Sequence, residues 1–171
     1  MNSKLAVLGA GVAVAVAVPA LTNAEAPAPT NFTQSTFVLT EADTNDFAFL
    51  DHPPKTKFGP QGPRKLSNGD QLVFRSKLLD AAKKRVGALD ATCMITGAGN
   101  GRFSQANAIC YATFTVPGGQ LFVQVGGKPF SGTTLGGITG GTGNYEGATG
   151  NFTSVGEESS KDTFHVWVPV K

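Results

Sequence analysis

The sequence has few charged residues and few side chains that bind metals. Charged residues make up 15% of the 171 residues, and the formal net charge is +2. No basic stripe or acidic tail is present, so the charge pattern does not indicate nucleic-acid binding. Two cysteines and two separated histidines make no metal-binding set, and we predict no metal site.

The short motifs of common enzyme classes are also missing. The chain contains no Gly-x-Ser-x-Gly, no His-Glu-x-x-His and no phosphate loop of the form Gly-x4-Gly-Lys-(Ser/Thr). A serine hydrolase, a zinc protease and a nucleotide-binding enzyme are therefore disfavoured. We predict no cofactor.

Beyond the N-terminal segment, no window of ten or more residues has a helical period. Instead, short runs alternate between apolar and polar residues and are separated by turn residues, with 22 glycines and 12 phenylalanines in the chain. Such runs predict seven or eight strands and an all-β fold, either a sandwich or a barrel. We favour a closed antiparallel β-barrel of about eight strands. The expected strands include 34–40, 70–80, 86–96, 107–116, 120–125, 151–155 and 162–168.

The N-terminus has the pattern of an export signal. Lys4 precedes an apolar run of about 14 residues, and small residues lead to Ala24. An uncleaved membrane anchor is the alternative, but the run is short for a bilayer span. We predict a signal peptide at 1–24, a disordered lead at 25–33 and one barrel domain at 34–171, with a secreted, extracellular protein that is not membrane-bound after cleavage.

Export affects how the two cysteines are interpreted. Cys93 and Cys110 lie in two strand-like runs that flank a Gly/Asn/Ser loop, so a hairpin would bring them together. Outside the cytoplasm such a pair is most simply a disulfide. A free thiol lining a pocket remains the alternative.

Two other segments are expected to be irregular. Residues 51–69 hold four prolines among lysines and glycines, which predicts a long surface loop and a candidate lid. Residues 136–150 hold closely spaced glycines, which favour tight corners that close the barrel. We expect Tyr145 to cover glycines there and Glu146 to cap backbone amides.

Two segments carry a resemblance to a known family. Residues 69–93, with Gly69-Asp-Gln at the start, Lys77-Leu-Leu-Asp80 in the middle and Cys93 at the end, look like the corresponding run of plant allene oxide cyclases. The stretch Thr139-Gly-Gly-Thr-Gly-Asn-Tyr-Glu-Gly-Ala-Thr-Gly150 resembles a second motif of that family, and dirigent proteins share a looser version. The resemblance spans about residues 37–155. It implies an eight-stranded antiparallel barrel with a largely apolar cavity, in a family whose members are often homo-oligomers. The export signal and the Ala/Val-rich composition suggest a secreted, bacterial member.

The family's reactive residues are mostly replaced here. Its glutamate and first asparagine fall on Val38 and Thr40, and its proline falls near Phe47. Its second asparagine falls on Ser76, and only its cysteine is retained, as Cys93. The resemblance therefore implies the barrel more strongly than the cyclase reaction.

Candidate site residues follow from these positions and from the strand pattern. The expected ligand-binding residues are Val38, Thr40, Phe47, Phe74 and Cys93. The candidates for acid–base chemistry are Glu41, Tyr111 and Ser76. For Glu41 the alternative is a solvated carboxylate in a turn. His165 is expected on the outer face of the last strand, because Phe164 and Val166 form the apolar face.

Two functions remain open from the sequence. One is a cofactor-free isomerase or cyclase that steers a small apolar molecule in the cavity, because holding a reactive chain folded supplies much of such catalysis. The other is a non-catalytic, dirigent-like or lipocalin-like binder of a lipid or phenolic ligand. A purely structural surface protein is a third, weaker reading, favoured by a solid barrel interior.

Overall fold

The computed structural model describes residues 31–52, 58–59, 62–63, 65–156 and 160–170. The predicted signal peptide, and all of the lead except residues 31–33, lie outside these ranges. In the described part of the chain, no helix is long and apolar enough to cross a membrane.

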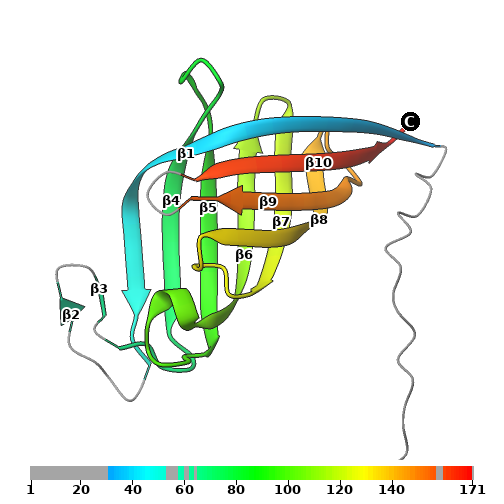
Figure 1. Cartoon of the computed structure of the whole chain (residues 1–171). Coiled ribbons are helices and arrows are strands. Elements are labelled where there is room, and N and C mark those ends of the chain that lie inside the picture. Colours follow the sequence, from blue (N-terminus) through cyan, green and yellow to red (C-terminus); the bar gives the residue numbers. More distant parts are fainter. Residues whose placement is uncertain (1–30, 53–57, 60–61, 64, 157–159, 171) are drawn as a thin grey trace, which may run out of the picture.

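Eight antiparallel strands form a closed barrel, which confirms the predicted fold (Figure 1). Around the barrel the order is β1-β10-β9-β8-β7-β6-β5-β4. Strands β4 to β10 each pair with the next strand in sequence, and β1 closes the barrel by pairing with both β10 and β4. A two-stranded ribbon, β2–β3, and a short 3-10 helix, η1, complete the described elements. The bounds are β1 Phe32–Leu50, β2 Phe58–Gly59, β3 Gly62–Pro63, β4 Gln71–Leu79, β5 Arg85–Gly97, η1 Phe103–Gln105, β6 Asn107–Val116, β7 Gly119–Gly127, β8 Thr133–Gly143, β9 Thr149–Val155 and β10 Lys161–Pro169.

Alternating side chains place an apolar face inside the barrel. In β5, Leu89, Ala91, Cys93 and Ile95 are buried. Asp90, Thr92 and Met94, which lie between them, are exposed. Because successive side chains of a strand point to opposite faces, this pattern fixes which face is internal.

The first strand differs from the prediction. The expected first strand was 34–40, and residues 41–46 have the polar composition of a turn, but β1 continues through them as one strand of 19 residues. Its first half pairs with β10 and its second half with β4, and Thr40 has a partner in both neighbours. A register shift between Ala42 and Asp46 marks the bend. The turn-forming residues thus produce a β-bulge that bends the strand, and this bend joins the two sets of strands that cross steeply in Figure 1.

The glycine-rich stretch also differs from the prediction. Its first half is the strand β8, and only residues 144–147 form a turn before β9. A Cβ on Gly141 would lie 2.5 Å from the Gln120 carbonyl oxygen and 2.6 Å from that of Tyr145. Close approach of neighbouring backbones, rather than a corner, therefore requires glycine at Gly141. Tyr145 closes over this point, and its hydroxyl donates a hydrogen bond to the Pro117 carbonyl at 3.2 Å.

Phenylalanine rings fill one part of the barrel interior. Phe114 and Phe164 are almost completely buried, with ring centroids 4.8 Å apart. Phe152 lies 5.2 Å from each of them, and Phe37 stacks on Phe164 at 4.9 Å. Aromatic contacts of this kind add to the stabilisation from burial. The cluster, called the phenylalanine floor below, packs between β1, β6, β9 and β10.

The end of the predicted loop 51–69 is fastened by a buried carboxylate. Asp70 is fully buried and accepts hydrogen bonds from the backbone amides of His52 and Ser67, at 2.9 and 2.7 Å, and from the Ser67 hydroxyl at 2.7 Å. Leu66 is buried as well. Most of the remaining loop, including its four prolines except Pro63, lies outside the described residues, so its role as a lid stays a prediction.

Candidate functional site

A cavity of about 740 Å³ occupies the barrel interior above the phenylalanine floor. Its walls come from every barrel strand except β10 and from the loops that follow β5, β7 and β9. Most of the lining is apolar, with a few serine and threonine hydroxyls. The lining residues are Glu41, Phe47, Leu72, Phe74, Leu89, Ala91, Cys93, Phe103, Ser104, Cys110, Ala112, Phe114, Val125, Pro129, Phe130, Gly132, Thr134, Phe152, Ser154, Gly156 and Ser160.

The predicted disulfide is present and forms part of the cavity wall. Cys93 of β5 lies directly opposite Cys110 of β6, and their sulfur atoms are 2.01 Å apart. Both residues are buried and line the cavity. The hairpin predicted from the sequence brings them together, and the alternative of a free thiol is wrong.

A pair of aromatic side chains from two loops stands at the rim. Phe103 of η1 and Phe130, between β7 and β8, meet edge to face with ring centroids 5.5 Å apart. Both rings line the cavity. Elements far apart in the sequence thus provide an apolar rim for a ligand.

Two carboxyl groups lie at the side of the cavity where β10 begins and β1 bends. Glu41 is half-buried and lines the cavity, and its backbone amide donates to the Ser160 carbonyl at 2.8 Å. Asp162 lies on the inward face of β10, in phase with Phe164, and is fully buried. It sits opposite Leu39 of β1 and Ser154 of β9.

The Asp162 carboxyl group is held in its neutral form by its surroundings. No hydrogen-bond partner lies in good geometry with either carboxyl oxygen among the described residues. Burial and, second, the nearby charge of Glu41 together raise the pKa of Asp162 from 3.8 to about 8. The hydroxyls of Ser154 and Ser160 act in the opposite direction. A carboxylic acid that keeps its proton near neutral pH can act as a general acid, and it becomes a base only after that proton has left.

The structure brings four of the predicted site residues together. Glu41, Phe47, Phe74 and Cys93 all line the cavity. Ser76 is buried on the inward face of β4 but lies outside the cavity lining.

Three other predicted residues point away from the cavity. Val38 and Tyr111 are exposed, at 40% and 57%, and Thr40 is in phase with Val38 along β1. Strand alternation explains this: each of them neighbours a residue that faces inward, such as Leu39 or Cys110. These three are therefore not placed to contact a ligand inside the barrel.

Sequence reasoning missed Asp162. The signal was present, because Asp162 precedes Phe164 and Val166 by the two-residue step that defines the inner face of the strand. An aspartate on an apolar face is costly to bury unless it is paired or neutral. That conflict between pattern and polarity would have identified it.

The histidine of the last strand lies on the outside, as predicted. His165 contacts the hydroxyl of Thr36 through Nδ1 at 3.0 Å, across the β1–β10 pair. In the described ranges, no three His, Cys, Asp or Glu side chains are grouped so that they could hold a metal ion.

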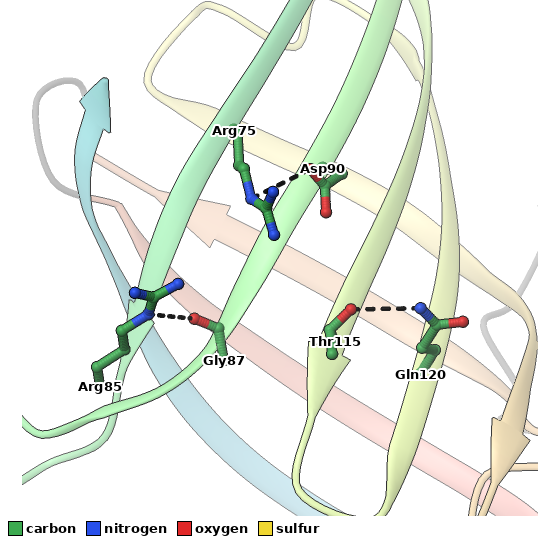
Figure 2. A network of polar contacts seen from close by, with 6 residues as sticks. All are labelled: Arg75, Arg85, Gly87, Asp90, Thr115 and Gln120. Carbon is green, nitrogen blue, oxygen red and sulfur yellow. Dashed lines mark hydrogen bonds and ion pairs between the residues drawn. The ribbon is translucent and has the colours of Figure 1, made fainter. Parts of the chain in front are cut away.

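The outer face of β4–β7 carries a second hollow, of about 900 Å³, that contains Val73, Tyr111 and Phe122. Arg75 and Asp90 line it, and their Nε and Oδ1 atoms are 3.4 Å apart; Figure 2 shows this ion pair among the polar contacts between neighbouring strands. Both side chains are about half exposed, so this ion pair contributes little stability. The hollow contains no buried ionisable group, and the internal cavity is the better candidate site.

Comparison with known proteins identifies the fold. The chain matches no protein-family model and no curated protein. Among solved structures, it is similar to pyocyanin demethylase, with a TM-score of 0.62 and 22% identity over 77% of this chain and 99% of that one. It is also similar to a pterocarpan synthase dirigent protein, with a TM-score of 0.60 and 15% identity over 81% of this chain and 90% of that one.

A third similar structure is a Diels-Alderase from Streptomyces koyangensis, with a TM-score of 0.53 and 13% identity over 82% of this chain and 70% of that one. These proteins share a barrel fold of the allene oxide cyclase and dirigent type with this chain. The fold implied by the sequence resemblance is therefore confirmed. At these identities the likeness concerns the fold alone.

Proposed function

We propose that this protein binds a small, largely apolar molecule in the barrel cavity and promotes its isomerisation or cyclisation without a cofactor. The main observation is the cavity itself, which combines an apolar lining with two adjacent carboxyl groups, the half-buried Glu41 and the fully buried Asp162. An apolar pocket with a few convergent polar groups of perturbed pKa is the usual form of a small-molecule site.

The two carboxyl groups suit proton transfer during such a reaction. Asp162 is neutral at pH 7, because its pKa is raised to about 8, so it serves as the acid. Glu41 reaches the cavity surface and can contact the ligand directly. The apolar walls contribute by holding the ligand in a reactive conformation and by excluding water.

A non-catalytic binder is the second candidate, and one observation favours it. Asp162 is fully buried and does not contact the cavity directly. It could exchange a proton with a ligand only through Glu41 or through the hydroxyls of Ser154 and Ser160. A binding protein would use the same cavity without proton transfer. The two candidates therefore share a site and differ in turnover.

We also propose that the protein is exported. The pattern of residues 1–24 and the Cys93–Cys110 disulfide both support this, since disulfides persist mainly in oxidising compartments. Comparing the N-terminus of the protein recovered from the medium with the encoded one tests the proposal.

The test combines ligand capture with a cavity-filling variant. Native mass spectrometry of the protein against lipid and phenolic extracts should show a bound small molecule, and conversion of that molecule should appear on incubation. Ala112→Phe places a ring in the cavity and should abolish capture. Thr113→Phe is the matched control, because the side chain of Thr113 lies on the outer hollow. Capture without conversion supports the binder, and equal capture by both variants contradicts a cavity site.

A further inference from the structure

The charge of the cavity restricts the class of ligand. Glu41 is the only ionisable side chain in the cavity lining of the described residues. No lysine, arginine or histidine of those residues faces the cavity to pair with an anion. A carboxylate ligand would therefore lose its water shell without gaining a cationic partner.

Asp162 adds a second acidic group just behind that surface. It is fully buried on the inward face of β10, and neither of its oxygens has a hydrogen-bond partner in good geometry among the described residues. Every described group that faces it is neutral or acidic: Leu39 and Glu41 from β1, Ser154 from β9, and Ser160 before β10. A cation bound at Glu41 would be the first positive charge next to this buried acidic group.

We propose that the cavity selects aromatic ligands that carry a protonated amine or an N–H group, which Glu41 binds with Asp162 behind it, and that it excludes carboxylates. The proposal rests on the proposed binding of a small molecule in this cavity. The ring of such a ligand packs between Phe74, Phe103 and Phe130, and its nitrogen donates to the Glu41 carboxylate.

A proton balance follows from this arrangement. In the free protein at pH 7, Asp162 is protonated because its pKa is about 8. A bound ammonium group keeps its own proton, and its positive charge favours the ionised form of Asp162. The carboxyl proton of Asp162 then leaves to the buffer. Binding of an amine therefore releases a fraction of a proton, whereas binding of a neutral alcohol releases none.

The experiment compares three probes that share one ring system: naphthylmethylamine, naphthylmethanol and naphthoate. Their affinities for the full chain are measured by titration calorimetry at pH 7, in two buffers of different ionisation enthalpy. We expect the amine to bind about tenfold more tightly than the alcohol, and naphthoate about tenfold more weakly. Only the amine should give a heat that depends on the buffer.

Variants assign the effect to the carboxyl pair. Glu41→Gln should reduce the preference for the amine to about threefold or less, and Asp162→Asn should abolish proton release. Asp90→Asn, on the outer face, is the matched acidic control and should change neither. Equal affinities for the three probes, or tightest binding of naphthoate, would overturn this inference and leave the proposed cavity function standing. If no probe binds, or if Ala112→Phe binds the probes as wild type does, both this inference and the proposed binding of a small molecule in the cavity are contradicted.

Discussion

Asp162 lies directly opposite Ser154 on the neighbouring strands β10 and β9, and both residues belong to the inward-facing rows of the barrel. This relationship places a carboxyl group in the barrel wall where the next residues of the same row are Phe164 and Val166. The serine only partly offsets the desolvation of the acid. The site thus retains a group that reduces stability at neutral pH, as functional sites often do.

The stability of the protein should therefore fall as the pH rises from about 4 to about 8. The pKa of Asp162 is raised from 3.8 to about 8, so within this window the folded chain holds a proton that the unfolded chain has lost. The free energy of unfolding then decreases with pH, by up to about 1.4 kcal/mol per pH unit. Guanidinium unfolding at pH 5, 7 and 9 measures this slope.

Asp162→Asn should remove most of that slope and should be more stable than wild type at pH 9 by a few kcal/mol, because an amide carries no charge to bury. Asp90→Asn is the control, since Asp90 is about half exposed, and it should keep the wild-type slope. A slope that persists unchanged in Asp162→Asn would contradict the neutral state of this acid.

The disulfide should contribute about 3 kcal/mol to stability, because it closes a loop with a sequence separation of 17. The double variant Cys93→Ala/Cys110→Ala should lose that amount in equilibrium unfolding. Reduction of the wild type should produce a similar loss, and reductant should leave the double variant unchanged. Thiol titration of the folded wild type should find no reactive cysteine, consistent with the absence of free cysteines.

Local alternation made much of the barrel predictable. The step of two along Leu89, Ala91 and Cys93 identifies a strand and its inner face without any knowledge of the partners. The hairpin joining β5 and β6 then places Cys93 beside Cys110. Features that depend on pairing with a strand distant in sequence were harder to predict, because they leave no local signal.

The bend of β1 shows why. Residues 41–46 have turn composition, yet they remain in a strand because β10 and β4 each pair with half of it. Tertiary pairing overrides local propensity here. The same long-range closure brings Glu41 next to Asp162. Because these residues are distant in sequence, their proximity could not be predicted from sequence spacing.

Asp70 should be essential for the loop that leads into β4. Asp70→Ala leaves the amides of His52 and Ser67 without the acceptor they have in the wild type. Each lost hydrogen bond to a charged group is worth about 1–3 kcal/mol, and because the two amides are only part-buried, a loss of about 1–3 kcal/mol in total is expected. Hydrogen exchange should show loss of protection at these two amides. Asp80→Ala is a useful contrast: Asp80 accepts from the amides of an exposed hairpin, and its loss should cost about 1 kcal/mol or less.

Adjacent glycines of β8 should respond oppositely to the same substitution. A Cβ on Gly136 would lie 2.8 Å from both the Gln124 carbonyl oxygen and a methyl carbon of Val125, so Gly136→Ala must displace neighbouring backbone and should cost about 1–3 kcal/mol. A Cβ on Gly137 meets nothing within 4 Å, and Gly137→Ala should be neutral or stabilising by up to about 1 kcal/mol, because it restricts the unfolded chain. Denaturant midpoints of the two variants decide this. Equal losses at both positions would mean that the glycines serve the strand through backbone freedom rather than through close approach to β7.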